Sequence, residues 1–269
     1  MQRISAGRHH TTYRIGDLSV TSLRDGYVDM PIERLRQPGN RRFGNELPAQ
    51  LQLVDGALRL SVNAFAIDDG HEITLIDTGS SNAWHPTMGF LPQALMEARI
   101  AVDRIRTVAF THTHLDHIQG LILPDGRDGF PQLGRLLVPR LELDMFRSEA
   151  RLSRFHDRAQ PLDPGQHLGA NIEAIAIPGH EIGHTGFRVT RGGETLLVWG
   201  DLVHVPSLQF DRPEVAWEYD ADQGQARATR LQILALAADN AYCVAGAHLD
   251  SPGIGRIFRT ETAFRFEPL

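Results

Sequence analysis

Cysteine is nearly absent from this chain of 269 residues, in which Cys243 is the single one. One cysteine excludes an intramolecular disulfide framework and any zinc cluster built from cysteine ligands. Cys243 lies in the apolar run at residues 242–245. This position favours a buried structural thiol over a reactive one.

Long apolar runs and clusters of basic residues are also missing. No apolar run approaches the roughly 18 residues of a membrane-spanning helix, and residues 1–17 lack the apolar core of a signal peptide. We therefore expect a cytoplasmic protein without a membrane partner, and we expect His9 and His10 to lie in a flexible terminus. The net charge of −6, without a run of Lys or Arg, argues against a nucleic-acid partner.

The overall composition is that of an ordinary globular protein. Hydrophobic residues make up 42% of the chain and charged residues 22%, and the length suffices for a sizeable core. The sequence has no short-period repeat, no low-complexity segment and no evident linker between domains. We therefore expect a single domain over residues 1–269.

Apolar strand patterns alternate with helical patterns in both halves of the chain, which predicts an α/β fold. Strands are expected at residues 18–23, 61–67, 72–76, 105–111, 136–138, 172–177, 186–190, 195–199 and 242–247, and helices at residues 92–99, 139–154 and 222–239. A scaffold of sheets with helices outside would carry a site at one edge of the strands.

Three local features add detail to this expectation. We interpret Asp25 and Gly26 as a turn, and residues 31–48 as a surface loop. In the helix expected at residues 222–239, Asp222 is a plausible cap of the N-terminus. The apolar stripe of that helix is expected to consist of Leu231, Leu234, Ala235 and Ala238.

The most informative stretch is Thr-His-Thr-His-Leu-Asp-His at residues 111–117, which follows an apolar run. A strand would point His112 and His114 to the same side, and a following loop or helix start would turn Asp116 and His117 towards a second nearby point. Histidine and aspartate are ligands of zinc and similar cations, so the spacing predicts two adjacent metal positions. The alternative is a polar strand end without metal, but packing alone hardly explains four such groups after a buried strand.

Other residues of the ligand type follow other expected strands, namely Asp77, His180, Asp201 and His248. The candidate metal ligands are His112, His114, Asp116, His117, His180, Asp201 and His248. These five imidazoles and two carboxylates suffice for two cations that share one carboxylate and one water. Two ions about 3.5–4 Å apart can hold a hydroxide between them, because metal binding lowers the pKa of water from about 15.7 towards about 7.

The motifs resemble those of the metallo-β-lactamase superfamily of hydrolases. Residues 112–117 resemble its His-x-His-x-Asp-His signature, and Leu-Ile-Asp-Thr-Gly at residues 75–79 resembles its first motif. Residues 178–185 resemble its Pro-Gly-His-Thr-Pro-Gly-His motif, with Glu181 and Ile182 in place of Thr and Pro.

Two further motifs extend the resemblance to almost the whole chain. Trp-Gly-Asp at residues 199–201 matches the fourth motif of the family, and Gly-Ala-His at residues 246–248 matches the last. Together the motifs run in the family's order over about residues 18–258, and as a set they are highly specific.

The resemblance implies an αβ/βα sandwich, in which two mixed β-sheets lie face to face with helices on their outer faces. His112, His114 and His180 would hold one metal ion. Asp116, His117 and His248 would hold the other, and Asp201 would bridge the two. Asp77 would orient the central motif from outside the ligand set, and His184 would be a supporting or structural residue.

Within the superfamily, the sequence is most similar to methyl parathion hydrolase and the related quorum-quenching lactonases. The residues that carry this likeness lie at 199–205, 209–213, 245–248 and 252–255. Asp201 at the bridging position argues against true β-lactamases, which typically have Cys there. Residues 124–170, where substrate choice usually resides, match no branch of the family.

His204 separates this chain from the N-acyl homoserine lactonases, which share the metal scheme but usually have Tyr at about this position. We expect His204 either to hydrogen-bond a substrate carbonyl or leaving oxygen, or to pack beside the site without a catalytic part. The residues Trp84, Phe90, Phe146, Phe210 and Trp217 are candidates for an apolar pocket, although each is favoured as part of the core.

We therefore expect a binuclear metal-dependent hydrolase whose metal-bridging hydroxide cleaves a lactone, a carboxylic ester or a phosphotriester. Asp201 would also accept or relay a proton. Two divalent ions are the expected cofactors, zinc by default and iron, cobalt or manganese otherwise. A small molecule is the expected substrate, and a homodimer is left open. The rival functions are an iron-dependent oxidoreductase resembling persulfide dioxygenases, and a binding protein with a degenerate site.

Overall fold

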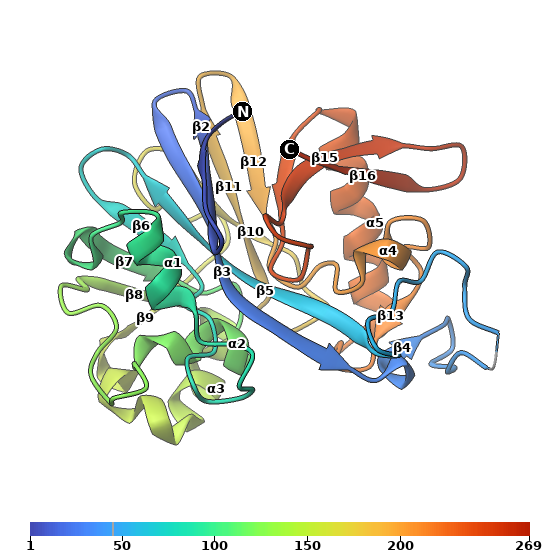
Figure 1. Cartoon of the computed structure of the whole chain (residues 1–269), viewed down its shortest axis with the longest axis horizontal. Coiled ribbons are helices and arrows are strands. Elements are labelled where there is room, and N and C mark those ends of the chain that lie inside the picture. Colours follow the sequence, from blue (N-terminus) through green and yellow to red (C-terminus); the bar gives the residue numbers. More distant parts are fainter. Residues whose placement is uncertain (45) are drawn as a thin grey trace.

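The computed structural model describes residues 1–44 and 46–269. Over these residues two large β-sheets lie face to face, with helices on both outer faces (Figure 1). This is the αβ/βα sandwich that the sequence motifs imply, so the expected fold class is confirmed. A small antiparallel sheet of β4 (Leu35–Arg36) and β13 (Ala216–Trp217) ties the N-terminal half to the C-terminal half.

The first sheet is mixed. Its strand order is β1-β2-β3-β5-β6-β7-β8-β9, with antiparallel pairs from β1 to β6 and parallel pairs from β6 to β9. Its strands are β1 (Gln2–Ala6), β2 (His10–Ile15), β3 (Leu18–Met30), β5 (Leu58–Asp68), β6 (Ile73–Ile76), β7 (Ile105–Ala109), β8 (Arg135–Pro139) and β9 (Ala159–Leu162).

The second sheet is also mixed, and its order is β10-β11-β12-β14-β15-β16. The pair β12–β14 is parallel, whereas the other neighbours are antiparallel. Its strands are β10 (Ile172–Ala176), β11 (Thr185–Arg191), β12 (Glu194–Val198), β14 (Cys243–Ala245), β15 (Ile254–Arg259) and β16 (Phe264–Pro268).

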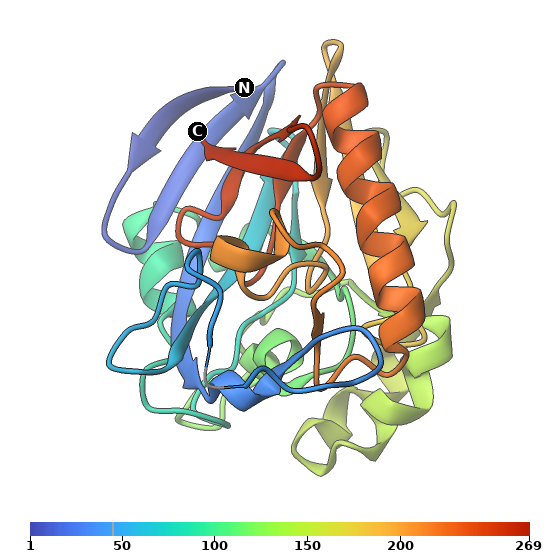
Figure 2. The same ribbon diagram turned by 90° about the vertical axis from the view of Figure 1, so that its right-hand side faces the viewer.

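Most of the helices are short, and the longest one covers the second sheet. The α-helices are α1 (Leu91–Glu97), α2 (Leu115–Ile118), α3 (Leu143–Ser148), α4 (Pro206–Gln209) and α5 (Gln223–Asp239). The 3₁₀ segments are Ile32–Arg34, Val102–Arg104, Gln119–Leu121, Arg140–Glu142 and Ala150–Arg158. Figure 2 shows α5 lying along the outer side of the second sheet. Among the described residues, no helix is long and apolar enough to cross a membrane.

Buried apolar side chains fill three layers between these elements. Phe65 of the first sheet and Phe187 of the second belong to the core between the sheets. Phe110 and Phe146 pack 6.0 Å apart in the layer between the first sheet and its helices. Leu234 of α5 belongs to the third layer, behind the second sheet. Burial of each such side chain contributes about 1.5–3 kcal/mol, so the sandwich is a rigid support for the loops at its edge.

The expected turn at Asp25 and Gly26 is wrong. Strand β3 continues through both residues, and a register shift against β5 between Arg24 and Gly26 marks a β-bulge. The bulge turns the buried carboxylate of Asp25 inward, where it accepts hydrogen bonds from the backbone N–H groups of Ser80, Gly89 and Leu91. Burial raises the pKa of Asp25 to about 6. A bulge explains the local Asp-Gly signal without a chain reversal.

The expected flexible terminus at His9 and His10 is also wrong. Both side chains are buried, and His10 begins strand β2. His9 Nδ1 lies 2.8 Å from Glu97 Oε1, and its ring stacks on Phe90 at 5.4 Å. The segment is therefore held by α1 and by the loop before it.

The helix expected over residues 139–154 is interrupted. The chain forms the 3₁₀ turn Arg140–Glu142, then α3, and then the 3₁₀ segment Ala150–Arg158. The break falls at Glu149, which has extended backbone angles and whose side chain accepts from the N–H of Arg151. This local hydrogen bond caps a new segment and competes with continuation of the helix.

In α5, the cap is confirmed but the expected stripe is partly wrong. Asp222 accepts from the N–H of Gln225 at 2.9 Å, as a helix cap does. Leu231 is 45% exposed, whereas Leu234 is buried. The buried face is rotated because Arg230 points inward and donates to the backbone carbonyls of residues 202, 213 and 215.

Two other expectations concern single segments. Cys243 is buried in β14, as expected. The segment expected to be a loop at residues 31–48 contains a 3₁₀ turn and the short strand β4, and its residue 45 lies outside the described residues.

Candidate metal centre

Two parallel strand pairs deliver the ligand-type residues to one end of the sandwich. After the pair β6–β7 come Asp77 and the run at residues 111–117, whose last part forms the short helix α2. After the pair β12–β14 come Asp201 and His248. Parallel neighbours end at the same edge of a sheet, which is where α/β proteins commonly build their sites. His180 reaches the same place from the loop between β10 and β11.

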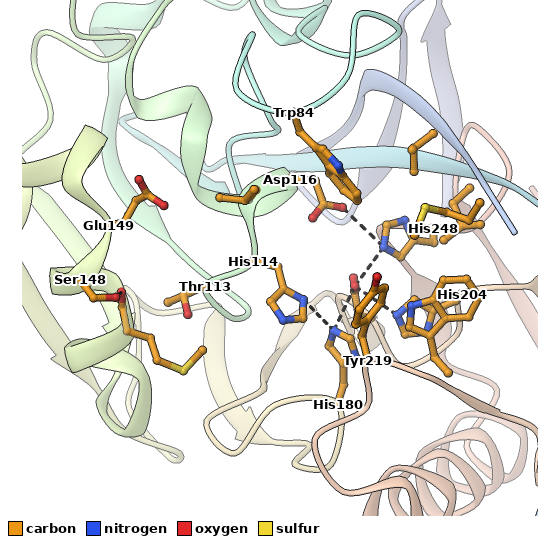
Figure 3. A pocket seen from close by; sticks show the side chains of 17 residues that line it. Trp84, Thr113, His114, Asp116, Ser148, Glu149, His180, His204, Tyr219 and His248 are labelled. Carbon is orange, nitrogen blue, oxygen red and sulfur yellow. Dashed lines mark hydrogen bonds and ion pairs between the residues drawn. The ribbon is translucent and has the colours of Figure 1, made fainter. Parts of the chain in front are cut away.

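One group of donor atoms consists of His112, His114, His180 and Asp201, whose ligand atoms lie within 4.8 Å of one another. His114 Nδ1 lies 3.2 Å from His180 Nε2. Asp201 Oδ2 lies 3.4 Å from His180 Nε2 and 3.7 Å from His112 Nε2. His114, His180 and Asp201 line a cavity, and Figure 3 shows His114 and His180 turned towards each other.

The second group consists of Asp116, His117 and His248, whose ligand atoms also lie within 4.8 Å of one another. Asp116 Oδ2 lies 3.6 Å from both His117 Nε2 and His248 Nε2. Asp201 reaches this group as well, since its Oδ1 lies 3.2 Å from His117 Nε2 and its Oδ2 lies 2.9 Å from His248 Nε2. Asp201 therefore faces both groups.

Several of these atoms are buried without a hydrogen-bond partner. Within the described chain this holds for His112 Nε2, His117 Nε2 and Asp201 Oδ1. Buried polar atoms are nearly always paired, so three such atoms turned towards one another call for a further partner. Imidazole nitrogen and carboxylate oxygen suit zinc and similar divalent cations, with bonds of about 2.0–2.2 Å. The residues present thus fit two cations.

The outer nitrogens of the imidazoles are held from behind, which decides where their lone pairs point. Asp77 Oδ2 lies 2.9 Å from His117 Nδ1, and the same carboxylate accepts from the N–H and hydroxyl of Thr111. Asp220 Oδ1 lies 2.9 Å from His180 Nδ1, and His248 Nδ1 donates to the backbone carbonyl of Ser61 at 2.7 Å. Because carboxylates and carbonyls only accept, Nδ1 of each ring carries a proton and Nε2 is turned towards the donor groups, where it can bind a cation.

His184 acts on the backbone of Asp201 rather than on the cluster of donor atoms. Its Nε2 accepts a hydrogen bond from the N–H of Asp201 at 3.2 Å. Gly200, with a φ of 53°, packs against the His184 ring, because an added Cβ would lie 2.8 Å from His184 Nε2. The structure thus places His184 beside the site as a support of the loop that carries Asp201.

Burial and mutual charges set the protonation of the cluster. Burial lowers the pKa of His112, His180 and His184 well below the ordinary value of 6.5. These rings are neutral near pH 7 and keep a lone pair. Burial alone would raise the pKa of Asp201, but the facing imidazoles, chiefly His248, hold it well below 3.8. Asp201 is therefore an anion.

A cavity of about 400 Å³ opens above the two groups. The apolar part of its lining includes Val28, Met30, Leu60, Trp84 and Trp217. Tyr219 lies near the candidate ligands (Figure 3). The lining also includes Met145, Ser148 and Glu149 from the segment around α3. A space of this size, with one polar end, suits a small organic molecule.

His204 also lines the cavity and is packed between aromatic rings. Its ring stacks on Trp217 at 5.1 Å and lies 5.2 Å from the ring of His248. Its Nε2 lies 3.3 Å from Asp201 Oδ2, and neither ring nitrogen has a well-directed hydrogen bond among the described residues. Burial lowers the pKa of His204 to about 4, so the ring is neutral at pH 7.

Of the five aromatic residues considered for the pocket, two line the cavity and three do not. Trp84 and Trp217 line the cavity. Phe146 and Phe210 lie in the core, and Phe90 is partly exposed beside His9.

Three carboxylates near the site were not found from the sequence. Asp220 supports His180, and Glu181 supports His114 at 2.8 Å. Glu142 is buried and accepts from the N–H and hydroxyl of Thr113, which stands between two candidate ligands. Of these three, Glu181 could have been noticed in the sequence, because it stands where the motif that this segment resembles has Thr. Asp220 and Glu142 belong to no motif.

Comparisons with known proteins extend these observations. Residues 57–248 match the family model of the metallo-beta-lactamase superfamily. Among curated proteins, the chain is 29% identical over 181 residues to an atrochrysone carboxyl ACP thioesterase of Aspergillus fumigatus. That match covers 65% of this chain and 48% of the relative, so the chain spans about half the length of that protein.

Solved structures with the same fold cover nearly the whole chain. A hydrolase of the beta lactamase superfamily, AbOPH, superimposes with a TM-score of 0.85 at 24% identity, over 98% of this chain and 99% of its own. The dizinc quorum-quenching lactonase AidC, in complex with a product, gives a TM-score of 0.83 at 21% identity, over 97% of both chains. At these identities the likeness establishes the fold.

Proposed function

Since the chain belongs to the metallo-beta-lactamase superfamily, we propose that it is a binuclear metal-dependent hydrolase of neutral lactones and esters. The observation that carries the proposal is the position of Asp201, whose two oxygens face the imidazoles of both donor groups. One shared carboxylate between two donor groups, each with a buried imidazole nitrogen that has no hydrogen-bond partner, is the arrangement of a two-metal hydrolase.

The roles of the side chains follow from the two groups. His112, His114 and His180 would hold one ion, and Asp116, His117 and His248 would hold the other, with Asp201 shared. Two divalent ions, zinc by default, would supply a water-derived nucleophile near neutral pH and Lewis acidity for the attacked group. Burial lowers the pKa of His112 and His180, whereas the facing carboxylates raise the pKa of His114, His117 and His248, which would release their protons when a cation binds.

Charge in the cavity favours a neutral substrate. The charged side chains that line it are the acidic Asp116, Asp201 and Glu149, and within the described residues no Arg is part of the lining. Away from the two proposed cations, a second carboxylate or a phosphate group on the substrate would meet no Arg side chain in the described lining. Lactones, carboxylic esters and phosphotriesters are neutral, and the apolar part of the lining at Leu60 and Trp84 fits an acyl or aryl substituent.

His204 is the proposed proton donor to the leaving oxygen of the substrate. A proton released during the attack can pass from Asp201 Oδ2 to His204 Nε2, 3.3 Å away, and the ring then donates to the leaving oxygen. Because the ring is neutral at pH 7 and has no well-directed hydrogen bond among the described residues, it is available for both steps.

The relatives support this reaction class. AidC is a dizinc lactonase, and the Aspergillus fumigatus relative is a thioesterase. Both reactions open an acyl bond by attack of water on a carbonyl carbon. A thioester is therefore a useful member of the substrate panel, together with an N-acyl homoserine lactone, a simple lactone, an aryl ester and a phosphotriester.

Metal removal tests the proposal. The protein is dialysed against a chelator, assayed on the panel, and assayed again after zinc or cobalt is added, while an oxygen electrode records O₂ uptake. We expect hydrolysis to disappear with the metal, to return with it, and to proceed without O₂ uptake. Full activity of the metal-free protein would contradict the proposal, and iron-dependent O₂ consumption would identify the rival oxidoreductase.

A further inference from the structure

One carboxylate at the centre departs from the motif that the chain resembles. Glu181 directly follows His180 and stands where that motif has Thr. Its Oε1 lies 2.8 Å from His114 Nε2. Among the described residues His114 is its one ion-pair partner, and the Glu181 side chain is 12% exposed. A largely buried carboxylate that faces a single imidazole calls for a reason.

We propose that Glu181 is a positioning residue that fixes the tautomer and orientation of His114 and so sets the metal affinity of the position formed by His112, His114 and His180. The inference rests on the proposed function, because it assumes that these residues hold a metal ion. It goes further because it assigns Glu181, which stands where the resembling motif has Thr, to one of the two metal positions.

The tautomer follows from the geometry. A carboxylate only accepts hydrogen bonds, so His114 Nε2 carries the proton and Nδ1 keeps its lone pair. Nδ1 lies 3.2 Å from His180 Nε2, whose own lone pair is left free because His180 Nδ1 donates to Asp220. Two lone pairs that face each other at this distance repel one another unless a cation or a shared proton lies between them, and the two lone pairs are placed to bind a cation together.

His114 needs this support more than its neighbours do. Its side chain is 32% exposed, whereas those of His112 and His180 are 0% and 3% exposed. Packing fixes the two buried rings, but one side of the His114 ring faces the cavity. Glu181 is well placed to hold it, because the Glu181 carbonyl accepts from the N–H groups of Gly179 and His184 and pins the backbone.

The two metal positions differ in their outer carboxylates. The position of His112, His114 and His180 has two of them, Glu181 and Asp220. The other position has Asp77 behind His117, and a backbone carbonyl behind His248. Carboxylates behind imidazoles raise ligand basicity, and their loss typically weakens metal binding by about 10–100-fold. Loss of Glu181 should therefore weaken one ion and spare the other.

Titration of the metal-free protein with Co²⁺, followed by visible absorption and calorimetry, tests this inference. We expect wild type to bind two equivalents, and Glu181→Ala to bind one of them about 10–100-fold more weakly. Glu181→Gln should lose less, because its amide oxygen still accepts from His114 but carries no charge. The control Glu97→Ala removes a carboxylate–imidazole pair of the same 2.8 Å length, at His9, and should change neither equivalent.

The outcomes separate the inference from the proposed function. If wild type binds no Co²⁺, the proposed function is wrong and the inference falls with it. If wild type binds two equivalents and Glu181→Ala binds both as tightly, the inference alone is wrong. Equal weakening of both equivalents, with a lower unfolding stability of the metal-free variant, would also overturn it, since Glu181 would then support the fold rather than one ligand.

Discussion

The N-terminal and C-terminal halves of the molecule build their shares of the centre in different ways. The N-terminal half supplies four candidate ligands from residues 112–117, and one carboxylate, Asp77, holds both ends of that run through Thr111 and His117. The C-terminal half supplies His180, Asp201 and His248 from three separate loops.

Each ligand of the C-terminal half has a support of its own. Asp220 faces His180, His184 accepts from the backbone of Asp201, and the Ser61 carbonyl of the opposite sheet accepts from His248. The difference teaches that a contiguous motif can share one support, Asp77, to which Glu181 adds a separate one at His114, whereas each dispersed ligand has its own. Loss of Asp77 should therefore disturb several ligands, and loss of a support in the C-terminal half a single ligand.

The largest effect is expected where the two halves meet, at Asp201. Asp201→Ala removes the one carboxylate that faces both donor groups, so the protein should lose metal and about 10³-fold or more of its kcat/KM, equivalent to about 4 kcal/mol. Metal analysis and assays on the best substrate of the panel measure both. The exposed Asp211→Ala is the matched control and should behave as wild type. Retention of a tenth of the activity by Asp201→Ala would show that neither group depends on it.

Asp77→Asn and Asp220→Asn test the comparison directly. Asp77→Asn should weaken both metal equivalents, since its carboxylate supports Thr111, next to His112, as well as His117. Asp220→Asn should weaken one equivalent by about 10–100-fold. Metal titration of the two variants side by side gives the pattern. If each variant weakens only one metal equivalent, Asp77 does not support ligands of both metal positions. The proposed difference between the two halves is then wrong.

His204→Phe tests whether the C-terminal half also supplies the proton donor to the substrate. Phe keeps the ring that stacks on Trp217 but removes both nitrogens. We expect kcat to fall by about 10²-fold, as for loss of a general acid, with unchanged metal content. A fall in metal content in parallel with kcat would instead make His204 a part of the metal site.

The α/β class could be predicted from the strand pattern, because each strand that bears a ligand is a short apolar run that ends in a polar residue, whereas the sandwich of two sheets was implied by the resemblance of the motifs. The run at residues 111–117 needs no tertiary information, since its spacing alone separates two groups of donor atoms. The cap at Asp222 was equally readable, because it depends on a contact three residues away.

The errors and omissions arose where distant contacts decide. The Asp-Gly pair at residues 25–26 is a turn signal locally, but N–H groups from residues 80–91 hold Asp25 in a bulge. The inward Arg230 rotates the buried face of α5, because backbone carbonyls far along the chain accept from it. Asp220 could not be recognised for the same reason, since its partner lies 40 residues away and no motif joins them.

The last expected effect is on stability rather than on activity, and concerns Glu142, which lies where the two halves touch. It holds Thr113 of the N-terminal motif, and an added Cβ at Gly183 of the C-terminal loop would lie 2.8 Å from its Cγ. Burial raises the pKa of Glu142 to about 7 from the ordinary 4.5. The folded protein therefore binds this proton more tightly than the unfolded chain does, and the stability gained is complete below about pH 4.5 and lost as the pH rises through about 7.

Glu142→Gln removes that dependence, because its amide stays neutral. The stability of wild type relative to the variant should fall by about 1.4 kcal/mol per pH unit across this window, and by about 3 kcal/mol in all. Urea unfolding of both metal-free proteins at pH 4.5, 6 and 8 measures the difference, since a bound cation would itself lower the pKa. A constant difference across the three pH values would mean that Glu142 is ionised throughout, and that the junction between the halves carries a buried charge held by Thr113 alone.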